Sequence, residues 1–208
     1  GPQSRICVIN GDAEYMHVAV PLPGEHQALA AGIAVAAVDV LRGSGFEIAE
    51  VPLLEGLAAT RVPGRMELAW EQPRILVDGA HNPVSLTALM RCVGGHLPYD
   101  SMVCVFGCCE DKDVDQMLER AALGGDKFIF TRARGNPRSM DPEDLQRRFS
   151  EISGKMSQVA PTVPEALELA TQAVGRDDLI CVTGSFYLVG ETKKYLADVE
   201  RRRASARA

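Results

Sequence analysis

The sequence predicts an α/β fold in which a mainly parallel sheet carries helices on both faces, with a smaller α/β segment before it. Beyond residue 65, short apolar runs alternate with helical patterns, which is typical of parallel strands joined by crossover helices. The runs Met102–Phe106 and Leu179–Val182 are apolar throughout, as expected for strands that are covered on both faces.

The first part of the chain predicts a hairpin followed by two helices. The runs Ile6–Ile9 and Met16–Val20 indicate strands that turn around Asn10-Gly11-Asp12. The segment Glu25–Leu41 is rich in alanine and apolar nearly all round, so we expect a helix that is buried on most sides. The segment Ile48–Thr60 indicates a second, shorter helix.

After a break at Pro63-Gly64-Arg65, strands and helices alternate to the end of the chain. Strands are predicted at Met66–Trp70, Ile75–Val77, Met102–Phe106, Phe128–Thr131, Met156–Val159 and Leu179–Thr183. Helices are predicted at Val84–His96, Val114–Ala122, Pro142–Ile152, Pro164–Val174 and Phe186–Arg201. The part before residue 60 has too few strands for a complete α/β domain. We therefore expect an incomplete domain over residues 1–59 and a complete one over residues 60–208.

The composition excludes several classes of function. The 208 residues carry a formal net charge of -6 and no dominant basic region, which disfavours nucleic-acid binding through phosphate neutralisation. No apolar run approaches the roughly 20 residues that cross a bilayer, so we expect a cytoplasmic protein without membrane contact. The start Gly1-Pro2-Gln3-Ser4 has no initiator methionine, and we expect the chain to be part of a longer protein.

The six cysteines predict packing rather than metal binding. Cys7, Cys104 and Cys181 lie inside apolar runs, where a thiol usually behaves as a small core side chain. The adjacent Cys108 and Cys109 lack the paired spacing of a zinc site, so we assign no metal ligands to this chain. A reactive vicinal thiol pair is the alternative interpretation of these two residues.

The segment Val77-Asp78-Gly79-Ala80-His81-Asn82-Pro83 is the strongest candidate for a site, because polar groups crowd the end of a buried strand. Asp78 could accept hydrogen bonds from ribose hydroxyls or orient a base, and His81 could contact an anion or move protons. The alternative is that Asp78 or Asn82 caps the helix that starts near Pro83. Capping explains one or two of these polar residues but not all of them, so we favour a site.

Other loops hold weaker candidates. Arg65 follows a tight turn, and its guanidinium suits phosphate or carboxylate, although a surface arginine is the simpler interpretation. Ser185 opens the last helix, where it could present an anion site or act as a plain cap. Lys112 could face an anion in the loop after Phe106, although a solvated charged turn is the simpler interpretation of that segment taken alone. His26 and Gln27 could reach a ligand at the start of their helix, or serve in packing and capping.

The order of these loops resembles the folylpolyglutamate synthase/dihydrofolate synthase family of the Mur ligase superfamily. The motifs are L-P-G-E-H-Q, P-G-R-M-E, D-G-A-H-N-P, G-x-x-x-D-K-D and T-G-S-F-Y-L-V-G-E, spread from about residue 19 to about residue 196. The resemblance implies a Rossmann-like C-terminal glutamate ligase domain over residues 60–208, preceded by the end of the ATP-binding central domain over residues 1–59. It also implies a monomeric ATP-dependent ligase that adds L-glutamate to folate or dihydropteroate through an acyl phosphate.

The resemblance extends to individual residues. It implies that Arg65 meets the ATP phosphates, Asp78 meets the ATP ribose, and His81 and Ser185 lie near the reacting and glutamate groups. It also implies nucleotide contacts for His26 and Gln27. The ligands of Mg²⁺ and the phosphate loop are expected in an N-terminal part, because this sequence holds no G-x-x-x-x-G-K-S/T segment. We therefore expect the isolated chain to be inactive.

The sequence departs from the family pattern at one position. The pattern H-Q-x-x-N places an asparagine near adenine, whereas Ala30 stands there in this chain and cannot hydrogen-bond a base. The departure motivates one alternative, a non-catalytic binding module that kept the fold and lost ATP. A Mur-type ligase for another acid substrate is a further alternative.

Overall fold

The computed structural model describes residues 4–11 and 13–206, so the predicted turn residue Asp12 lies outside the described residues. The chain divides into two compact units, Gly1–Pro63 and Gly64–Ala208. Within the described ranges, no helix has both the length and the apolar character needed to cross a membrane.

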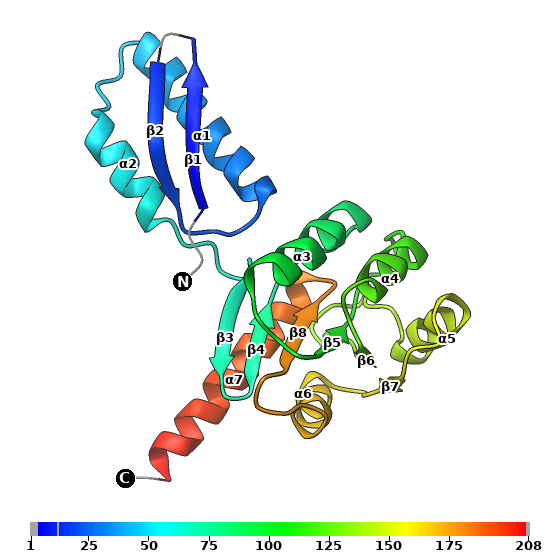
Figure 1. The fold of residues 1–208 in the computed structure, drawn as a ribbon. Coiled ribbons are helices and arrows are strands. Elements are labelled where there is room, and N and C mark those ends of the chain that lie inside the picture. Colours follow the sequence, from blue (N-terminus) through cyan, green and yellow to red (C-terminus); the bar gives the residue numbers. More distant parts are fainter. Residues whose placement is uncertain (1–3, 12, 207–208) are drawn as a thin grey trace. The chain divides into compact units, whose positions relative to one another are not determined.

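The second unit contains a six-stranded sheet in the order β3-β4-β8-β5-β6-β7 (Figure 1). Its strands are β3 (Glu67–Glu71), β4 (Arg74–Val77), β5 (Met102–Phe106), β6 (Lys127–Phe130), β7 (Ser157–Val159) and β8 (Leu179–Thr183). Strand β3 pairs antiparallel with β4, and every other pair is parallel. The predicted mainly parallel α/β sheet is therefore confirmed.

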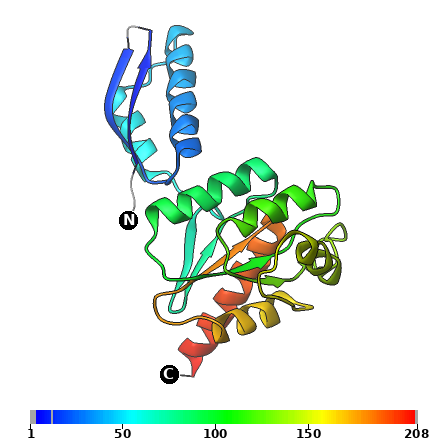
Figure 2. The same ribbon diagram turned by 45° about the vertical axis from the view of Figure 1, so that its right-hand side comes forward.

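Helices cover both faces of this sheet, as Figures 1 and 2 show. They are α3 (Pro83–His96), α4 (Val114–Ala122), α5 (Pro142–Ile152), α6 (Val163–Gln172) and α7 (Phe186–Ser205). Helices α3, α4 and α5 pack on one face, and α6 and α7 pack on the other. All of these helices and strands lie within a few residues of their predicted positions.

The alternation of side chains along the central strands produces two separate cores. In β8, Leu179 and Cys181 belong to the core under α3, α4 and α5, whereas Ile180 and Val182 belong to the core under α6 and α7. Successive side chains of a strand point to opposite faces, so an entirely apolar strand supplies both cores. This explains why the apolar runs in the sequence identified the central strands.

The first unit is a two-stranded antiparallel sheet with two helices. It contains β1 (Ser4–Asn10), β2 (Ala13–Val20), α1 (Glu25–Gly43) and α2 (Glu50–Ala59). Its buried core consists of Tyr15, Val18 and Val35, with a few partly buried neighbours. A polar cluster supports it, because Asp39 accepts hydrogen bonds from Asn10 at 3.0 Å and from Tyr15. The hydrogen bond from Tyr15 to Asp39 is the largest cause of the raised pKa of Tyr15.

Two expectations about the first unit are wrong. Helix α1 is not buried on most sides, because only Ala31 and Val35 are buried and apolar residues such as Leu29 (66% exposed) face outward. Two strands and one other helix offer too little surface to cover it. Cys7 is exposed rather than packed in a core, because it lies on the outward-facing side of β1.

Candidate functional site

The carboxyl ends of the parallel strands meet at one side of the larger sheet, which we call the strand-end edge. Backbone hydrogen bonds join the segments that follow these strands. Asp78 N donates to Val182 O at 3.0 Å and Gly184 N donates to Ala80 O at 3.0 Å. Gly79 N donates to Gly64 O at 2.8 Å, which ties the turn before β3 to the same edge. The loops that carry Arg65, Asp78, His81 and Ser185 are therefore brought together, as expected for strand ends of a parallel sheet.

Two glycines permit the close approach of these loops. Gly184 has φ of +109°, and a Cβ there would lie 2.6 Å from Gly107 O. A Cβ on Gly107 would lie 2.3 Å from Thr131 O. Neither backbone neighbour can move as a flexible side chain would, so both positions need a residue without a side chain.

Asp78 fixes the turn that carries Arg65. Its Oδ2 accepts a hydrogen bond from Met66 N at 2.9 Å, and its Oδ1 accepts one from Ala80 N at 2.8 Å. Met66 has φ of +44°, a left-handed conformation that is uncommon for a residue with a side chain. The buried Asp78 carboxylate compensates for that conformation with a charge-assisted hydrogen bond.

Arg65 lies beside this carboxylate and over an aromatic ring. Its Nη1 is 4.0 Å from Asp78 Oδ1, and its Cζ is 4.5 Å from the centroid of the Phe186 ring. The Arg65 side chain is 28% exposed, so its guanidinium is held by the protein and still reaches solvent. Such a guanidinium can donate parallel hydrogen bonds to a phosphate or a carboxylate.

His81 is oriented by the backbone that precedes it. Its Nδ1 lies 2.8 Å from Gly79 O, which accepts a hydrogen bond when Nδ1 carries the proton. Nε2 is then the acceptor atom of the ring. The ring centroid lies 6.0 Å from that of Phe186, so His81 and Arg65 both adjoin the same aromatic residue.

The capping interpretation holds for Asn82 and does not hold for Asp78. Asn82 Oδ1 accepts from Ser85 N at 2.8 Å, and Ser85 Oγ accepts from Asn82 N at 3.2 Å, which forms a capping box for α3. Ser185 is the N-cap of α7, and its Oγ accepts from Leu188 N at 3.2 Å. A serine hydroxyl that caps a helix keeps its proton for a second hydrogen bond.

Sequence reasoning missed the pair Glu67 and Lys193, which holds the Arg65 turn from the other side. Glu67 Oε2 accepts from Gly64 N at 2.7 Å, and Lys193 Nζ lies 2.7 Å from Glu67 Oε1. Partial burial opposes ionisation, yet the hydrogen bonds from Lys193 and Gly64 lower the pKa of Glu67 overall. The partners are 126 residues apart, so no local pattern pointed to them.

In the loop after β5, Lys112 and Asp113 both have partners nearby in the sequence. Asp113 caps α4 by accepting from Gln116 N at 3.3 Å, and Lys112 Nζ lies 3.0 Å from Asp111 Oδ2. Cys108 and Cys109 are buried, and burial raises the pKa of Cys108 to about 12. A thiol with such a pKa is not a reactive nucleophile at neutral pH, so the reactive-pair interpretation is wrong for Cys108.

The remaining predicted site residues lie in the first unit. His26 and Gln27 occupy the first turn of α1, where His26 is exposed and Gln27 is half-buried. Ala30 is exposed one turn later on the same helix. Within residues 4–11 and 13–206, no group of three or more histidine, cysteine, aspartate or glutamate side chains could hold a metal ion.

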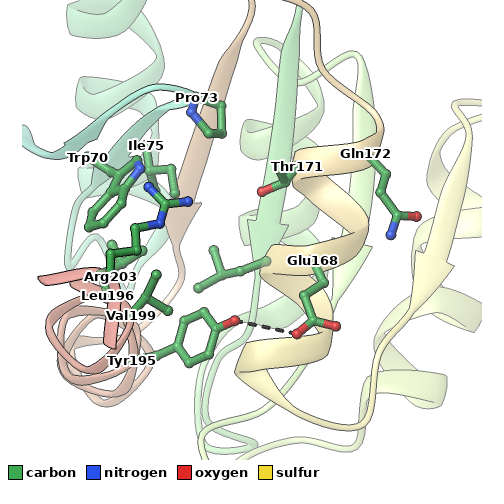
Figure 3. A pocket seen from close by; sticks show the side chains of 11 residues that line it. Trp70, Pro73, Ile75, Glu168, Thr171, Gln172, Tyr195, Leu196, Val199 and Arg203 are labelled. Carbon is green, nitrogen blue, oxygen red and sulfur yellow. Dashed lines mark hydrogen bonds between the residues drawn. The ribbon is translucent and has the colours of Figure 1, made fainter. Parts of the chain in front are cut away.

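A separate pocket of about 280 Å³ lies between the β3–β4 hairpin, α6 and α7 (Figure 3). Apolar side chains such as Ile75 and Leu196 form part of its lining, and none of the predicted site residues line it. Three of its polar side chains have partners within the lining: Arg203 Cζ lies 5.1 Å from the Trp70 centroid, and Tyr195 donates to Glu168 at 3.4 Å. Burial and the Glu168 carboxylate raise the pKa of Tyr195.

Comparison with known proteins shows that the second unit matches a known protein family. Residues 64–186 match the family described as "Mur ligase, glutamate ligase domain". A probable bifunctional folylpolyglutamate synthase/dihydropteroate synthase of Haloferax volcanii is 32% identical over 191 residues, 92% of this chain and 22% of that protein. A 2,6-diaminopimelate-adding UDP-N-acetylmuramoyl-L-alanyl-D-glutamate ligase of Coxiella burnetii is 30% identical over 164 residues, 73% of this chain and 32% of that protein.

A solved structure agrees with these sequence matches. The Mycobacterium tuberculosis folylpolyglutamate synthase complexed with ADP and AMPPCP is 29% identical, with a TM-score of 0.82 over 88% of this chain and 43% of that one. The chain thus spans less than half the length of each of these relatives.

Proposed function

Because this chain belongs to the Mur ligase family through its glutamate ligase domain, we propose that it is the C-terminal part of an ATP-dependent ligase that adds glutamate to folate or dihydropteroate. The observation that carries the proposal is the Arg65 guanidinium, which stands at the strand-end edge beside Asp78 and over the Phe186 ring that His81 also adjoins. An anchored, partly exposed cation at this edge suits the phosphates of a nucleotide. The intact ligase acts as a monomer with ATP and Mg²⁺.

The proposed reaction forms an amide in two steps. A carboxylate oxygen of the folate or dihydropteroate substrate attacks the γ-phosphorus of ATP, which gives an acyl phosphate and releases ADP. The amino group of glutamate then attacks the acyl carbon, inorganic phosphate leaves, and the nitrogen loses its proton as the amide forms. Positioning and charge stabilisation are the main tasks of the protein in phosphoryl transfer.

We assign separate roles to the residues at the edge. Arg65 binds the phosphates with its guanidinium. Asp78 holds the Arg65 turn through Met66 N, and its carboxylate is the acceptor that we assign to the ribose hydroxyls. His81 lies toward the reacting groups, where Nε2 can accept a proton from the glutamate nitrogen. The Ser185 hydroxyl donates a hydrogen bond to the glutamate carboxylate, while its oxygen accepts the hydrogen bond that caps α7.

For the first unit we propose the end of an ATP-binding central domain, with residues 1–59 belonging to it and residues 60–208 to the glutamate ligase domain. Two observations support this assignment. The two-stranded sheet is too small to cover α1, and the apolar side chains Ile33 (62% exposed) and Val40 (69% exposed) stay uncovered. In the intact ligase, His26 and Gln27 contribute to nucleotide binding, and the Mg²⁺ ligands lie in the N-terminal part.

Two observations favour alternative functions. Ala30 stands where the family pattern has an asparagine, which favours a non-catalytic module that lost ATP. The similarity to the Coxiella burnetii ligase favours a Mur-type ligase for another acid substrate. The first alternative is tested by titrating ATP into the protein extended by its natural upstream sequence, because tight Mg²⁺-dependent binding contradicts a module that lost ATP. The second alternative is tested by assaying the same extended protein with other acid acceptors in place of folate.

The proposed ligase activity is tested through Arg65 in the extended protein, by following ATP-dependent transfer of labelled glutamate to folate or dihydropteroate. Arg65→Met should lower kcat/KM by about 100-fold, the typical loss when a charge-stabilising donor is removed. Arg61→Met is the matched control, because Arg61 is exposed and its Nη1 donates to the adjacent Thr60 O. Full activity in Arg65→Met would contradict the proposed binding of phosphates by Arg65. Glutamate addition by the 208-residue chain alone would contradict its proposed inactivity.

A further inference from the structure

One face of α7 contacts the turn that carries Arg65. Phe186, Val189 and Lys193 are spaced by three and four residues, so they lie along one side of the helix. A Cβ on Gly64 would lie 3.1 Å from Val189 and 3.4 Å from Phe186, so both side chains pack against the backbone of the turn. Lys193 completes the contact through Glu67.

Phe186 is the member of this face that reaches the candidate site. The centroid of its ring lies 4.5 Å from Arg65 Cζ and 6.0 Å from the centroid of the His81 ring. Gly79 leaves space for the ring, because a Cβ there would lie 2.4 Å from it. Phe186 is nevertheless 42% exposed, so burial of apolar surface is a poor account of a phenylalanine at this position.

We infer that Phe186 is a positioning residue that holds the Arg65 guanidinium in a preset orientation through a cation–π contact; this inference rests on the phosphate role of Arg65 proposed above. A long arginine side chain loses rotamer freedom when it binds an anion. A side chain that is already ordered loses less, so the anion binds more tightly. Asp78 orders the backbone of the turn, and Phe186 orders the end of the side chain.

A purely packing role for Phe186 would give a different outcome in variants. Leucine keeps an apolar side chain against Gly64 and Gly79 but has no aromatic face for the guanidinium. Tyrosine keeps both properties. If the cation–π contact is what matters, Phe186→Leu loses the preset orientation of the Arg65 guanidinium and Phe186→Tyr keeps it. If Phe186 only packs against the turn, the two variants differ little.

The first measurement is made on the 208-residue chain without ligand, by following the Arg65 Nε–Hε signal in ¹⁵N-correlated NMR spectra. We expect an upfield ring-current shift of Hε in the wild type and in Phe186→Tyr, and its loss in Phe186→Leu. Phe46→Leu is the matched control, because Phe46 is a 60% exposed phenylalanine in the first unit. An Arg65 Hε signal at its random-coil position in the wild type overturns the inference, whether or not a variant folds.

The second measurement titrates tripolyphosphate and ADP into the same variants by calorimetry. Phe186→Leu should weaken binding by about 3- to 10-fold, the range that an exposed to partly desolvated cation–π contact supports. In an Arg65→Met background, Phe186→Leu should have no further effect. Equal affinity of the wild type and Phe186→Leu overturns the inference. Absence of any anion binding by the wild type instead removes the phosphate role of Arg65, and the ring-current shift still decides whether Phe186 positions that side chain.

Discussion

Gly184 imposes the strongest steric requirement at the strand-end edge, because it combines a positive φ with close contact to the backbone of Gly107. Gly184→Ala should lower the free energy of unfolding by about 2 kcal/mol or more, through left-handed strain and displacement of the Gly107 carbonyl. The measurement is urea unfolding followed by circular dichroism.

Gly190 is the matched control for this substitution, because it lies in α7 with open space around its Cβ position. Gly190→Ala should leave stability unchanged or raise it by up to about 1 kcal/mol, since alanine favours a helix. Similar destabilisation by both substitutions would mean that the tight contact at Gly184 does not limit stability.

At the scale of residues, the sequence predicted which side chains gather at the edge better than it predicted their hydrogen bonds. The cap at Asn82 follows from a local pattern that any sequence reading can find. The contact between Asp78 and Met66 N does not, because it connects residues on either side of the β3–β4 hairpin. The role of Phe186 was missed for the same reason, since its partners precede it by more than 100 residues.

At the scale of elements, α7 links the end of β8 to the turn before β3. Its N-cap Ser185 lies two residues after the end of β8, and its Lys193 pairs with Glu67 two turns along. The helix was predicted from its pattern, but the face that it presents to the turn was not, because the pairing of β4 with β8 sets that orientation. Helix periodicity specifies a stripe of residues and leaves its partner undefined.

The Glu67–Lys193 pair predicts a pH dependence of stability. The folded pKa of Glu67 lies below its ordinary value of 4.5, so the pair stabilises the fold above that pH and loses its contribution as pH falls through the folded pKa. At pH 7, Glu67→Gln should cost about 0.5–1 kcal/mol, the range for a partly exposed pair after solvent screening.

Urea unfolding between pH 7 and pH 3.5 measures this effect. The difference between the wild type and Glu67→Gln should shrink below pH 4.5. The exposed Glu119 provides the control substitution, Glu119→Gln. A wild-type advantage that stays constant down to the lowest pH would exclude ionisation of Glu67 as its source.

At the scale of the whole molecule, the two units differ greatly in their cores. The second unit has two large clusters of buried side chains, one on each face of its sheet. The first unit has a core of Tyr15, Val18 and Val35. The sequence predicted the elements and the mainly parallel sheet of the second unit because its strands alternate regularly with helices, whereas the order of the strands was not predicted. It overestimated the burial of α1 because an apolar pattern does not reveal how much partner surface is present.

This difference predicts that residues 64–208 fold without the first unit. Small units bury too little apolar surface to be stable by themselves, whereas a unit with two full cores should unfold cooperatively. A chain of residues 64–208 should keep the urea midpoint of the main transition of the whole chain. Hydrogen exchange of the whole chain should show faster exchange in residues 13–63 than in the central strands. Loss of cooperative unfolding in the shortened chain would contradict this prediction.

The pairing of β1 with β2 has a consequence for the behaviour of the chain in solution. Within the described residues each of these strands pairs on one side, and they run for seven and eight residues, whereas the edge strands β3 and β7 of the larger sheet have five and three. A long strand with unpaired N–H and C=O groups is a template for another chain, while a very short edge is a poor one. Intermolecular aggregation of this protein should therefore begin at the hairpin, and the larger sheet should contribute little to it.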